Sequence, residues 1–371
     1  MQIPRLSLLI LLFCFIACTD DDPGTIGDDQ VADETLFPNF TIINLEQDGV
    51  ISFNFDASTQ EGAIINLSND EGISPNILNT YIAGNVIGFY TFNTGWLLDL
   101  ETGVINMGTN MFEQTNEILP NWVVNNNDRV YTGFHTDSNL TNFNINVQNL
   151  NNGELRQFPF GNIGQSTPPV FGNDHFIFHR NEGSADSNAL GFFGLIDTRS
   201  DLALGPITLE GDFIIGSVFG ENNDVYLFST EDRYYRYDLN GLGLIEVQPS
   251  SFRQIITGRE RLMNNRLYYT FVSQQTIIPE FPAIYDLNTN ANQVIDLSFS
   301  FQEIQKERDF ISLLPTDIQF SLSENAWLVG YEFTASDATT TGGGVFKVDN
   351  DGTILSEIAL DFAPQNIFIL E

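Results

Sequence analysis

Cysteine is almost absent from this sequence. Its 371 residues include only two cysteines, Cys14 and Cys18, and both lie near the N-terminus. The rest of the chain therefore has no thiol for a disulfide, a cysteine-ligated zinc or a cysteine nucleophile. The fold has to rest on its hydrophobic core, and 32 Phe and 11 Tyr residues are enough for a large one.

Basic residues are scarce as well. The chain has 14 Lys and Arg against 49 Asp and Glu, a formal net charge of −35, and its only lysines are Lys306 and Lys347. Such a surface repels phosphate backbones and anionic head groups, so we expect no nucleic-acid partner. It favours solubility in water rich in salt or divalent ions, where counterions screen the self-repulsion.

Long apolar runs are missing except at the N-terminus. Residues 1–5 supply one positive charge, and residues 6–16 are apolar apart from Ser7. An eleven-residue helix spans about 16 Å, roughly half of what the hydrocarbon core of a bilayer requires. The segment therefore predicts a secretory signal peptide and not a transmembrane helix.

The apolar run ends in Phe15-Ile16-Ala17-Cys18, which resembles the lipobox of bacterial lipoproteins. In that family the chain is cut before the cysteine, whose thiol is diacylated and whose new amine is usually acylated too. The resemblance implies that residues 1–17 are removed and that Cys18 carries the lipid anchor, since several acyl chains hold a protein on a membrane. Phe15 departs from the usual Leu. The alternative is an ordinary signal peptide with a chance cysteine.

Residues 18–38 are rich in acidic side chains, beginning with Asp20, Asp21 and Asp22. Low hydrophobicity with high like charge predicts a disordered tether. An acidic run just after the lipidated cysteine also resembles the export signal of Bacteroidota surface lipoproteins. This resemblance implies an outer-membrane lipoprotein displayed at the cell surface. The alternative is a solvated spacer on a lipoprotein that faces the periplasm.

The remaining residues, 39–371, repeat with a period of about 47 residues. One mark is an apolar strand that ends in Asp or Asn and is followed by a turn, as in residues 97–103 and 284–288. Asp and Asn favour such turns because their side chains bond to their own backbone. A second mark is an Asn turn that opens a β-branched or aromatic strand, as in residues 127–131 and 265–268. Each unit thus contains four short strands, which we call a to d.

Four short strands repeated every 40 to 60 residues predict an all-β fold, a β-propeller most simply of seven four-stranded blades. Each blade buries its two apolar faces on its neighbours. A solenoid of stacked β-arches is the competing all-β interpretation. The first repeat is divergent, with residues 47–51 as its a–b turn and 64–67 as its c–d turn. The last strand, 366–370, has no unit of its own and is expected to close the ring on the first blade.

One turn resembles a named propeller family. Asp99 to Gly103 is similar to the Asp-x-x-Thr-Gly turn of quinoprotein-type propellers, but the tryptophan that usually follows is missing and Met107 stands nearby. Such turns are common in propellers, so the resemblance supports the fold and not a quinone site. Residues 301–314 are the one place where a short helix is expected, because Phe301, Ile304, Ile311 and Leu314 recur at helical spacing.

Motifs that carry chemistry are few. The sequence has no Gly-rich phosphate loop, His-Glu-x-x-His or Gly-x-Ser-x-Gly. His135, His175 and His179 fall in b strands of adjacent repeats, where a metal site is conceivable, but packing between blades is the favoured interpretation. Residues 348–352 resemble a calcium loop without its twelfth-position Glu, so a structural Ca²⁺ lacks support and we expect no cofactor.

Loop length and charge indicate where a ligand would bind. The expected b–c loops (181–190, 273–282 and 334–344) and d–a connections (108–120 and 298–317) are long and share one face of a propeller. Four of the twelve arginines, Arg253, Arg259, Arg261 and Arg266, surround the inner strand of the sixth repeat. We predict a ligand site there with Arg259 and Arg261, which share strand parity, against an anionic group. The alternative is that these arginines pair with carboxylates such as Glu260.

Two function classes remain open. The first is a non-catalytic binding lipoprotein that captures a glycan, a small molecule or another nutrient, with an outer-membrane transporter as a partner. The second is a propeller-fold lyase or hydrolase that acts on an extracellular polymer. The lack of a carboxylate-plus-base motif favours the first, although active sites in propellers are scattered along the sequence. Two convergent carboxylates in a pocket would favour the enzyme.

Overall fold

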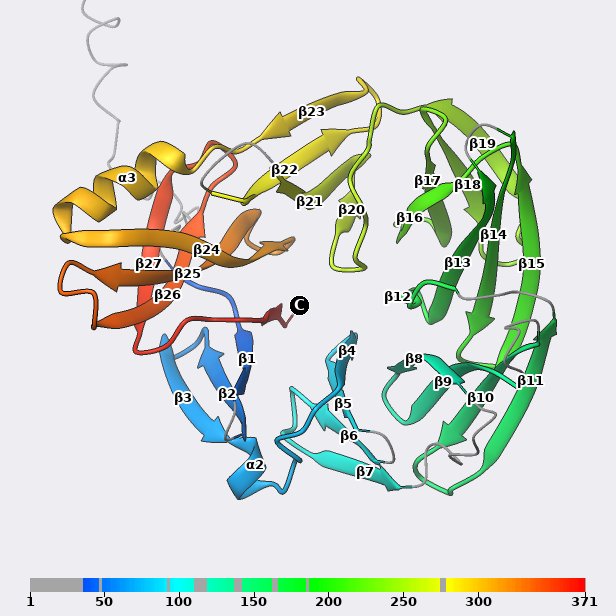
Figure 1. The fold of residues 1–371 in the computed structure, drawn as a ribbon, viewed down its shortest axis with the longest axis horizontal. Helices are drawn as coiled ribbons and strands as arrows, with labels where there is room; N and C mark the ends of the chain where they lie inside the picture. Colours follow the sequence, from blue (N-terminus) through cyan, green and yellow to red (C-terminus); the bar gives the residue numbers. More distant parts are fainter. Residues whose placement is uncertain are drawn as a thin grey trace, which may run out of the picture. The chain divides into compact units, whose positions relative to one another are not determined.

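The computed structural model describes residues 36–46, 49–91, 94–109, 119–136, 142–161, 166–184, 187–273 and 278–370. The chain divides into two units, Met1–Leu36 and Phe37–Glu371. The expected signal peptide, Cys18 and residues 18–35 of the expected tether lie outside the described residues. The second unit is all-β, and its seven four-stranded antiparallel sheets are the blades of a β-propeller (Figure 1).

The blades are numbered here along the chain, and each is given from its inner to its outer strand. Blade 1 contains β28 (Ile367–Ile369), β1 (Phe40–Glu46), β2 (Gly49–Asp56) and β3 (Glu61–Asn66). Blade 2 contains β4 (Asn79–Ala83), β5 (Val86–Tyr90), β6 (Thr94–Asp99) and β7 (Ile105–Thr109), and blade 3 contains β8 (Leu119–Asn125), β9 (Arg129–His135), β10 (Phe143–Asn149) and β11 (Leu155–Gly161). Blade 4 contains β12 (Val170–Gly172), β13 (His175–Ser184), β14 (Ser187–Asp197) and β15 (Leu202–Glu210).

The remaining blades follow the same order. Blade 5 contains β16 (Ile214–Phe219), β17 (Asp224–Ser229), β18 (Arg233–Asp238) and β19 (Leu244–Pro249). Blade 6 contains β20 (Arg261–Met263), β21 (Arg266–Val272), β22 (Glu280–Asp286) and β23 (Ala291–Val294). Blade 7 contains β24 (Phe310–Ser321), β25 (Ala326–Ala335), β26 (Thr341–Val348) and β27 (Ile354–Leu360). The seven-bladed fold expected from the repeat is therefore confirmed.

The Asn turns form tight a–b hairpins for a conformational reason. Asn173 and Asp174, between β12 and β13, have φ of 48° and 58°, and Asn264 and Asn265, between β20 and β21, have φ of 52° and 59°. Two consecutive left-handed residues make the two-residue turn whose twist matches that of the flanking strands, and Asn tolerates this region better than most residues.

Closure of the ring occurs as expected, but the strands of the first repeat are shifted by one position. β28 pairs with β1 and is the inner strand of blade 1, beside the centre of the ring in Figure 1. β1 and β2, which were expected as strands a and b, are therefore strands b and c of blade 1; residues 47–48 of the expected turn lie outside the described residues. Ile64 and Ile65 lie in β3, the outer strand, and helix α2 (Leu67–Asp70) follows them where a c–d hairpin was expected. The prediction failed because the inner strand of this blade comes from the far end of the chain.

Aromatic side chains fill the interfaces between blades. Tyr268 of blade 6 stacks on Phe320 of blade 7 with ring centroids 3.7 Å apart. Phe193 of blade 4 meets Tyr237 of blade 5 at 4.9 Å. These rings are nearly or completely buried, so the high Phe and Tyr content is used where a propeller needs large apolar faces.

The helix predicted at residues 301–314 is real but placed wrongly. Helix α3 spans Ser298–Glu307, and its end is fixed by the Arg308 N–H, which donates to the Ile304 carbonyl. Asp309 then takes φ 56°, which stops the helix. The rest of the predicted segment belongs to β24. Within the described part of the chain, no helix is long and apolar enough to cross a membrane.

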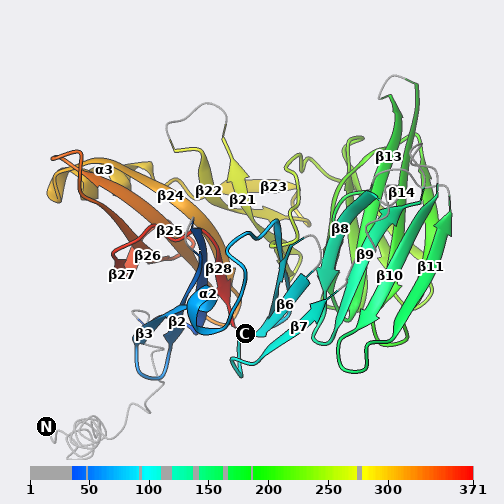
Figure 2. The ribbon, with the colours of Figure 1, turned by 60° about the horizontal axis from the view of Figure 1, so that its bottom comes forward.

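Two of the expected long b–c loops are hairpins extended by strand pairing. β13 and β14 remain paired to Ser184 and Ser187, and β25 and β26 pair up to Thr334 and Thr341. The d–a connection at 298–317 contains helix α3 and the first part of β24. In Figure 2 the hairpins β13–β14 and β21–β22 extend on the same side of the ring, as expected for b–c connections.

Candidate binding cavity between blades 6 and 7

The inner strand of blade 6 is much shorter than its neighbour. β20 has three residues and pairs only with Arg266–Tyr268 of β21, which has seven. The preceding connection, residues 250–260, is irregular and does not continue the strand. Phe252 in this connection is buried against Phe228 and Tyr269. The connection therefore packs between blades 5 and 6, and it forms no strand along residues 269–272 of β21.

A cavity of about 1050 Å³ lies beside residues 269–272 of β21, at the place that a longer β20 would occupy. Its walls are the connection 253–260, the upper half of β21 and the β24 segment 316–320 of blade 7. Aromatic side chains such as Phe271 and Trp327 share this lining with Gln254, Gln319 and Gln365. Three carboxylates and two guanidinium groups also line it: Glu260, Glu280, Asp317, Arg253 and Arg259.

Arg259 lines the cavity and crosses to blades 7 and 1. Its Nη1 and Nη2 each donate to Asp317 at 2.8 Å, and Nη2 also donates to the Ile367 carbonyl of β28 at 2.7 Å. Asp317 is almost fully buried and accepts two further bonds, from the backbone N–H groups of Ile318 and Ile367. Among the described residues, three of the five guanidinium N–H groups have partners within the protein, and the other two can donate to a ligand.

The structure does not bring Arg259 and Arg261 together. Arg259 precedes β20 and Arg261 is its first residue, so the parity of a common strand does not apply. Arg261 lines a second cavity of about 360 Å³, formed by the inner strands of blades 4, 5 and 6, and donates to the Glu260 carbonyl at 3.3 Å. The two guanidinium groups thus border different cavities.

The other two arginines of the cluster pair with carboxylates, as the alternative interpretation expected. Arg253 forms an ion pair with Asp232 at 2.5 Å, and Arg266 lies 3.5 Å from Asp286. Both side chains are about half exposed, so these pairs contribute little to stability.

Glu280 differs from the other two carboxylates of the cavity. Glu260 accepts from the backbone N–H groups of Thr257 and Gly258 at 2.8 and 2.7 Å, and Asp317 is held by Arg259. Among the described residues no hydrogen bond or ion pair reaches the Glu280 carboxylate. Burial and the neighbouring Asp317 raise the pKa of Glu280, and Arg259 lowers it in part. Sequence reasoning missed Glu280 and Asp317, because both fell in segments expected to be loops.

The three histidines are buried in blades 3 and 4. His135 lies against the Phe143 ring at 5.1 Å, the His175 ring contacts the Asn173 carbonyl at 2.5 Å, and the His179 ring contacts the Thr167 hydroxyl at 3.2 Å. Burial lowers the pKa of His179 to about 4. No group of three metal-ligating side chains is found in the part of the chain that the structure describes.

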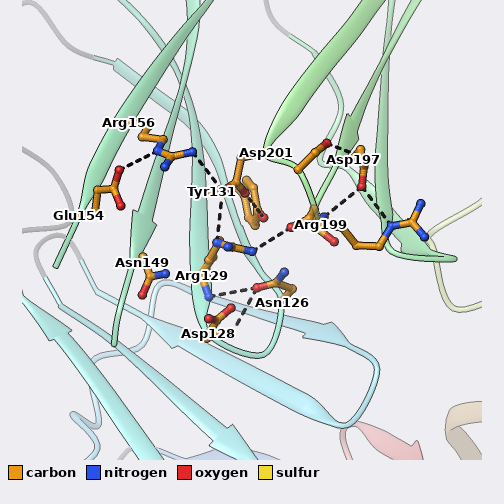
Figure 3. A network of polar contacts seen from close by, with 12 residues as sticks. Asn126, Asp128, Arg129, Tyr131, Asn149, Glu154, Arg156, Asp197, Arg199 and Asp201 are labelled. Atoms are coloured by element: carbon orange, nitrogen blue, oxygen red, sulfur yellow. Dashed lines mark hydrogen bonds and ion pairs between the residues drawn. The ribbon is translucent and has the colours of Figure 1, made fainter. Parts of the chain in front are cut away.

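A further charged network lies between blades 3 and 4 (Figure 3). Arg129 of β9 donates to the Thr198 carbonyl at 2.8 Å and lies 3.4 Å from the buried Asp201, to which the Tyr131 hydroxyl also donates. Burial, followed by the charge of Asp201, raises the pKa of Tyr131 above its ordinary range. The network joins the c–d turn of blade 4 to a strand of blade 3, and Asp201 is its buried centre.

Comparisons with known proteins do not assign this chain to a family. No family model and no curated protein matches the sequence. Among solved structures, the computationally designed Ika8 protein is similar at 14% identity, over 89% of each chain, with a TM-score of 0.46. A chain of the mitotic checkpoint complex is similar at 8% identity, over 79% of this chain and 76% of that one, with a TM-score of 0.42. At these values neither similarity supports an inference about function.

Proposed function

We propose that the protein is a lipid-anchored, non-catalytic binding protein of the outer membrane, displayed at the cell surface, and that its ligand enters the cavity between blades 6 and 7. The lipobox-like ending at Cys18 and the acidic residues that follow it support the anchor and the location. The proposed ligand is a glycan or another nutrient, and an outer-membrane transporter is the proposed partner.

The cavity is the observation that carries this proposal. At about 1050 Å³ it is slightly larger than most ligand sites, which enclose about 300 to 1,000 Å³. It combines apolar walls with a few convergent polar groups, and such groups orient a ligand in known sites. It also lies on a rigid frame, because Arg259 and Asp317 fix the inner strands of blades 7 and 1 around it.

The alternative of a lyase or hydrolase receives less support from the same residues. Glycoside hydrolysis, for example, uses two carboxyl groups, one as acid and one as base or nucleophile. Of the three carboxylates in the cavity, Glu260 holds a backbone turn and Asp317 holds Arg259. Glu280 alone is left for chemistry, and a single carboxylate does not make such a pair.

Anchoring is tested by replacing Cys18 with Ser and fractionating the cells. The variant should move from the membrane fraction to the soluble fraction, because the thiol that carries the diacyl group is gone. A variant that stays on the membrane as the wild type does would contradict the lipid anchor. Digestion of intact cells with a protease tests the location separately, and full protection would place the domain in the periplasm.

Ligand capture is tested with the soluble domain, a library of neutral and anionic oligosaccharides, and a variant that fills the cavity. Ile255 lines the cavity and is 77% exposed, so Ile255→Trp should obstruct the entrance without disturbing the core. We expect at least about tenfold weaker binding, a change of roughly 1.4 kcal/mol. Leu155→Trp, on the outer strand β11, is the matched control and should bind normally. Equal binding by both variants would contradict the site.

A further inference from the structure

The upper half of β21, residues 269–272, has no paired strand among the described residues on the side of β20. In an antiparallel pair, the N–H and C=O groups of successive residues point to opposite sides. Asn265 and Ser273, at the two ends of β21, both bond to the β22 side, to Leu287 and Pro279. The backbone N–H and C=O groups of the odd-numbered residues of β21 therefore point toward β22. Even-numbered residues face β20, which agrees with the pairing of Arg266 and Tyr268 with that strand.

By this alternation, the next two even-numbered residues are left without a strand. Thr270 and Val272 point their backbone N–H and C=O groups past the end of β20, and both residues line the cavity. In the chain as described, no protein group bonds to these four backbone atoms. Val272 is 51% exposed and lines the cavity, so an incoming chain can approach it from that side.

Blade 4 shows how the same situation is resolved elsewhere. Its inner strand β12 is also three residues long, beside the ten-residue β13. In blade 4, however, Thr167 occupies the place beside β13 that β12 does not reach. The Thr167 N–H donates to the His179 carbonyl at 2.8 Å, and the His179 N–H donates to the Thr167 hydroxyl at 3.3 Å. Blade 6 has no equivalent of Thr167 among the described residues, and the corresponding place is the cavity.

The side chains around this edge favour a basic occupant. Glu280 lies opposite Val272 in the β21–β22 pair, so the two side chains are on the same face of the sheet. Thr270 is on that face too, and its hydroxyl donates to the Ile318 carbonyl of blade 7 at 3.5 Å. A residue added next to Val272 would place its side chain on this face, about 10 Å from the β22 backbone. A lysine or arginine there reaches the Glu280 carboxylate, and the net charge of −35 also attracts cations.

We propose that the cavity receives an extended peptide segment of a partner protein, which pairs with the inner edge of β21 beyond the end of β20 and places a basic side chain beside Glu280. This inference rests on the proposed function, since it takes the same cavity as the binding site, and it assigns that cavity a peptide in place of a glycan. The backbone supplies affinity through up to four hydrogen bonds at Thr270 and Val272, and Glu280 supplies selectivity.

The test uses synthetic heptapeptides of alternating Val and Thr, with Lys or Glu at the central position, and the soluble domain. We expect the Lys peptides to bind at least tenfold more tightly than the Glu peptides, and Glu280→Gln to remove that preference. Glu210→Gln, at an exposed site on the outer strand β15, is the matched control and should keep it. Equal binding of the two peptide series by the wild type would contradict the role of Glu280.

Backbone pairing is tested with Val272→Pro and Val272→Ala. Proline removes the N–H that faces the cavity and leaves the ladder to β22 intact, because Val272 makes no bond to that strand. Alanine removes the side chain but keeps the N–H. We expect Val272→Pro to weaken binding about tenfold, as for a lost hydrogen bond of about 1.4 kcal/mol, and Val272→Ala to bind within about twofold of the wild type. Equal affinities for the two variants would overturn strand addition.

Hydrogen exchange on the wild-type protein tests the same pairing and does not depend on whether Val272→Pro folds. In free protein, the amide hydrogens of Thr270 and Val272 should exchange with solvent faster than those of Tyr269 and Phe271, which bond to β22. Saturation with the Lys peptide should slow exchange at Thr270 and Val272, and unchanged exchange there would contradict the inference. If oligosaccharides bind in the cavity and peptides do not, the inference fails and the proposed function stands. If neither class binds in a way that Ile255→Trp weakens, both fail.

Discussion

At the scale of single residues, Arg259 joins three blades through one side chain. It donates twice to Asp317 of β24 and once to the carbonyl of Ile367 in β28, and its guanidinium lies 5.5 Å from the Phe368 ring. Asp317 in turn accepts the Ile367 N–H. From the sequence, we predicted that the positive charge of Arg259 binds an anionic ligand. In the structure, the carboxylate of Asp317 balances that charge, next to the strand β28 that closes the ring.

Arg259→Ala should accordingly destabilise the fold. It leaves the nearly buried Asp317 without its charged partner, and breaking such a pair costs about 3 kcal/mol. Chemical denaturation measures the free energy of unfolding. Arg266→Ala is the control, because that side chain is mostly exposed and its partner Asp286 is 3.5 Å away; it should change stability by less than about 0.5 kcal/mol. Equal losses for the two variants would show that Arg259 does not hold the closure.

His179 gives the fold a defined acid sensitivity. Burial lowers its pKa to about 4, whereas the unfolded chain titrates near 6.5. The folded state therefore binds fewer protons than the unfolded state between these values. The stabilisation from neutral His179 is complete above about pH 6.5 and is lost as the pH falls toward 4, by about 3 kcal/mol in total.

The His179→Gln variant isolates this contribution, because glutamine does not titrate. The difference in unfolding free energy between wild type and variant should shrink or change sign between pH 7 and pH 4.5, and denaturation at several pH values measures it. Carboxylates titrate equally in both proteins and cancel in the difference. A difference that does not depend on pH would mean that His179 is protonated without cost.

At the scale of elements, the sequence predicts what is local and misses what is not. The Asn turns and the short alternating strands are set by neighbouring residues, and pairs such as Asn264 and Asn265 adopt the expected left-handed conformation. The inner strand of blade 1 depends on β28, which is contributed by the other end of the unit. The helix predicted at 301–314 is present only as far as Glu307 for the same reason, because residues 310–314 lie in β24, where Leu314 pairs with Glu332 of β25.

The closing strand β28 should be essential although it has only three residues. Ile367 is fully buried in the cluster that joins blades 1 and 7. Ile367→Asp places an unpaired charge there, and we expect a loss of more than about 4 kcal/mol, enough to unfold a marginally stable chain. Ile245→Asp, on the outer strand β19 at 50% exposure, should be nearly neutral. Circular dichroism during thermal unfolding compares them, and similar melting temperatures would mean that the ring is stable without closure.

The candidate site was harder to predict than the fold for a related reason. The arginine cluster did mark the correct blade, and Arg259 does line the cavity. The cavity itself exists because β20 stops after three residues while β21 continues. How far two strands remain paired is decided by tertiary contacts, here the packing of Phe252 between Phe228 of blade 5 and Tyr269 of blade 6. No pattern within residues 250–260 shows this.

At the scale of the whole molecule, the chain carries a formal net charge of −35. Such self-repulsion destabilises the compact state and is screened by salt. The melting temperature should rise when NaCl increases from about 10 mM to about 500 mM. The same titration with sucrose in place of salt is the control for general solvent effects, and a melting temperature that falls with NaCl would mean that ion pairs dominate over repulsion.

Closing the ring also affects the order in which the chain folds. The bond from the Asn44 side chain to the Ala363 carbonyl joins residues 319 positions apart, and closing a loop of about 320 residues costs about 5 kcal/mol of chain entropy. The hairpins of blades 2 to 6 need only neighbouring residues, so they form first and the meeting of β1 with β28 comes late. Until then β1 presents a bare edge, which is the kind of surface on which nascent chains associate with one another. The time spent with the ring open, more than the stability of the finished ring, then sets how much of the protein reaches its folded form.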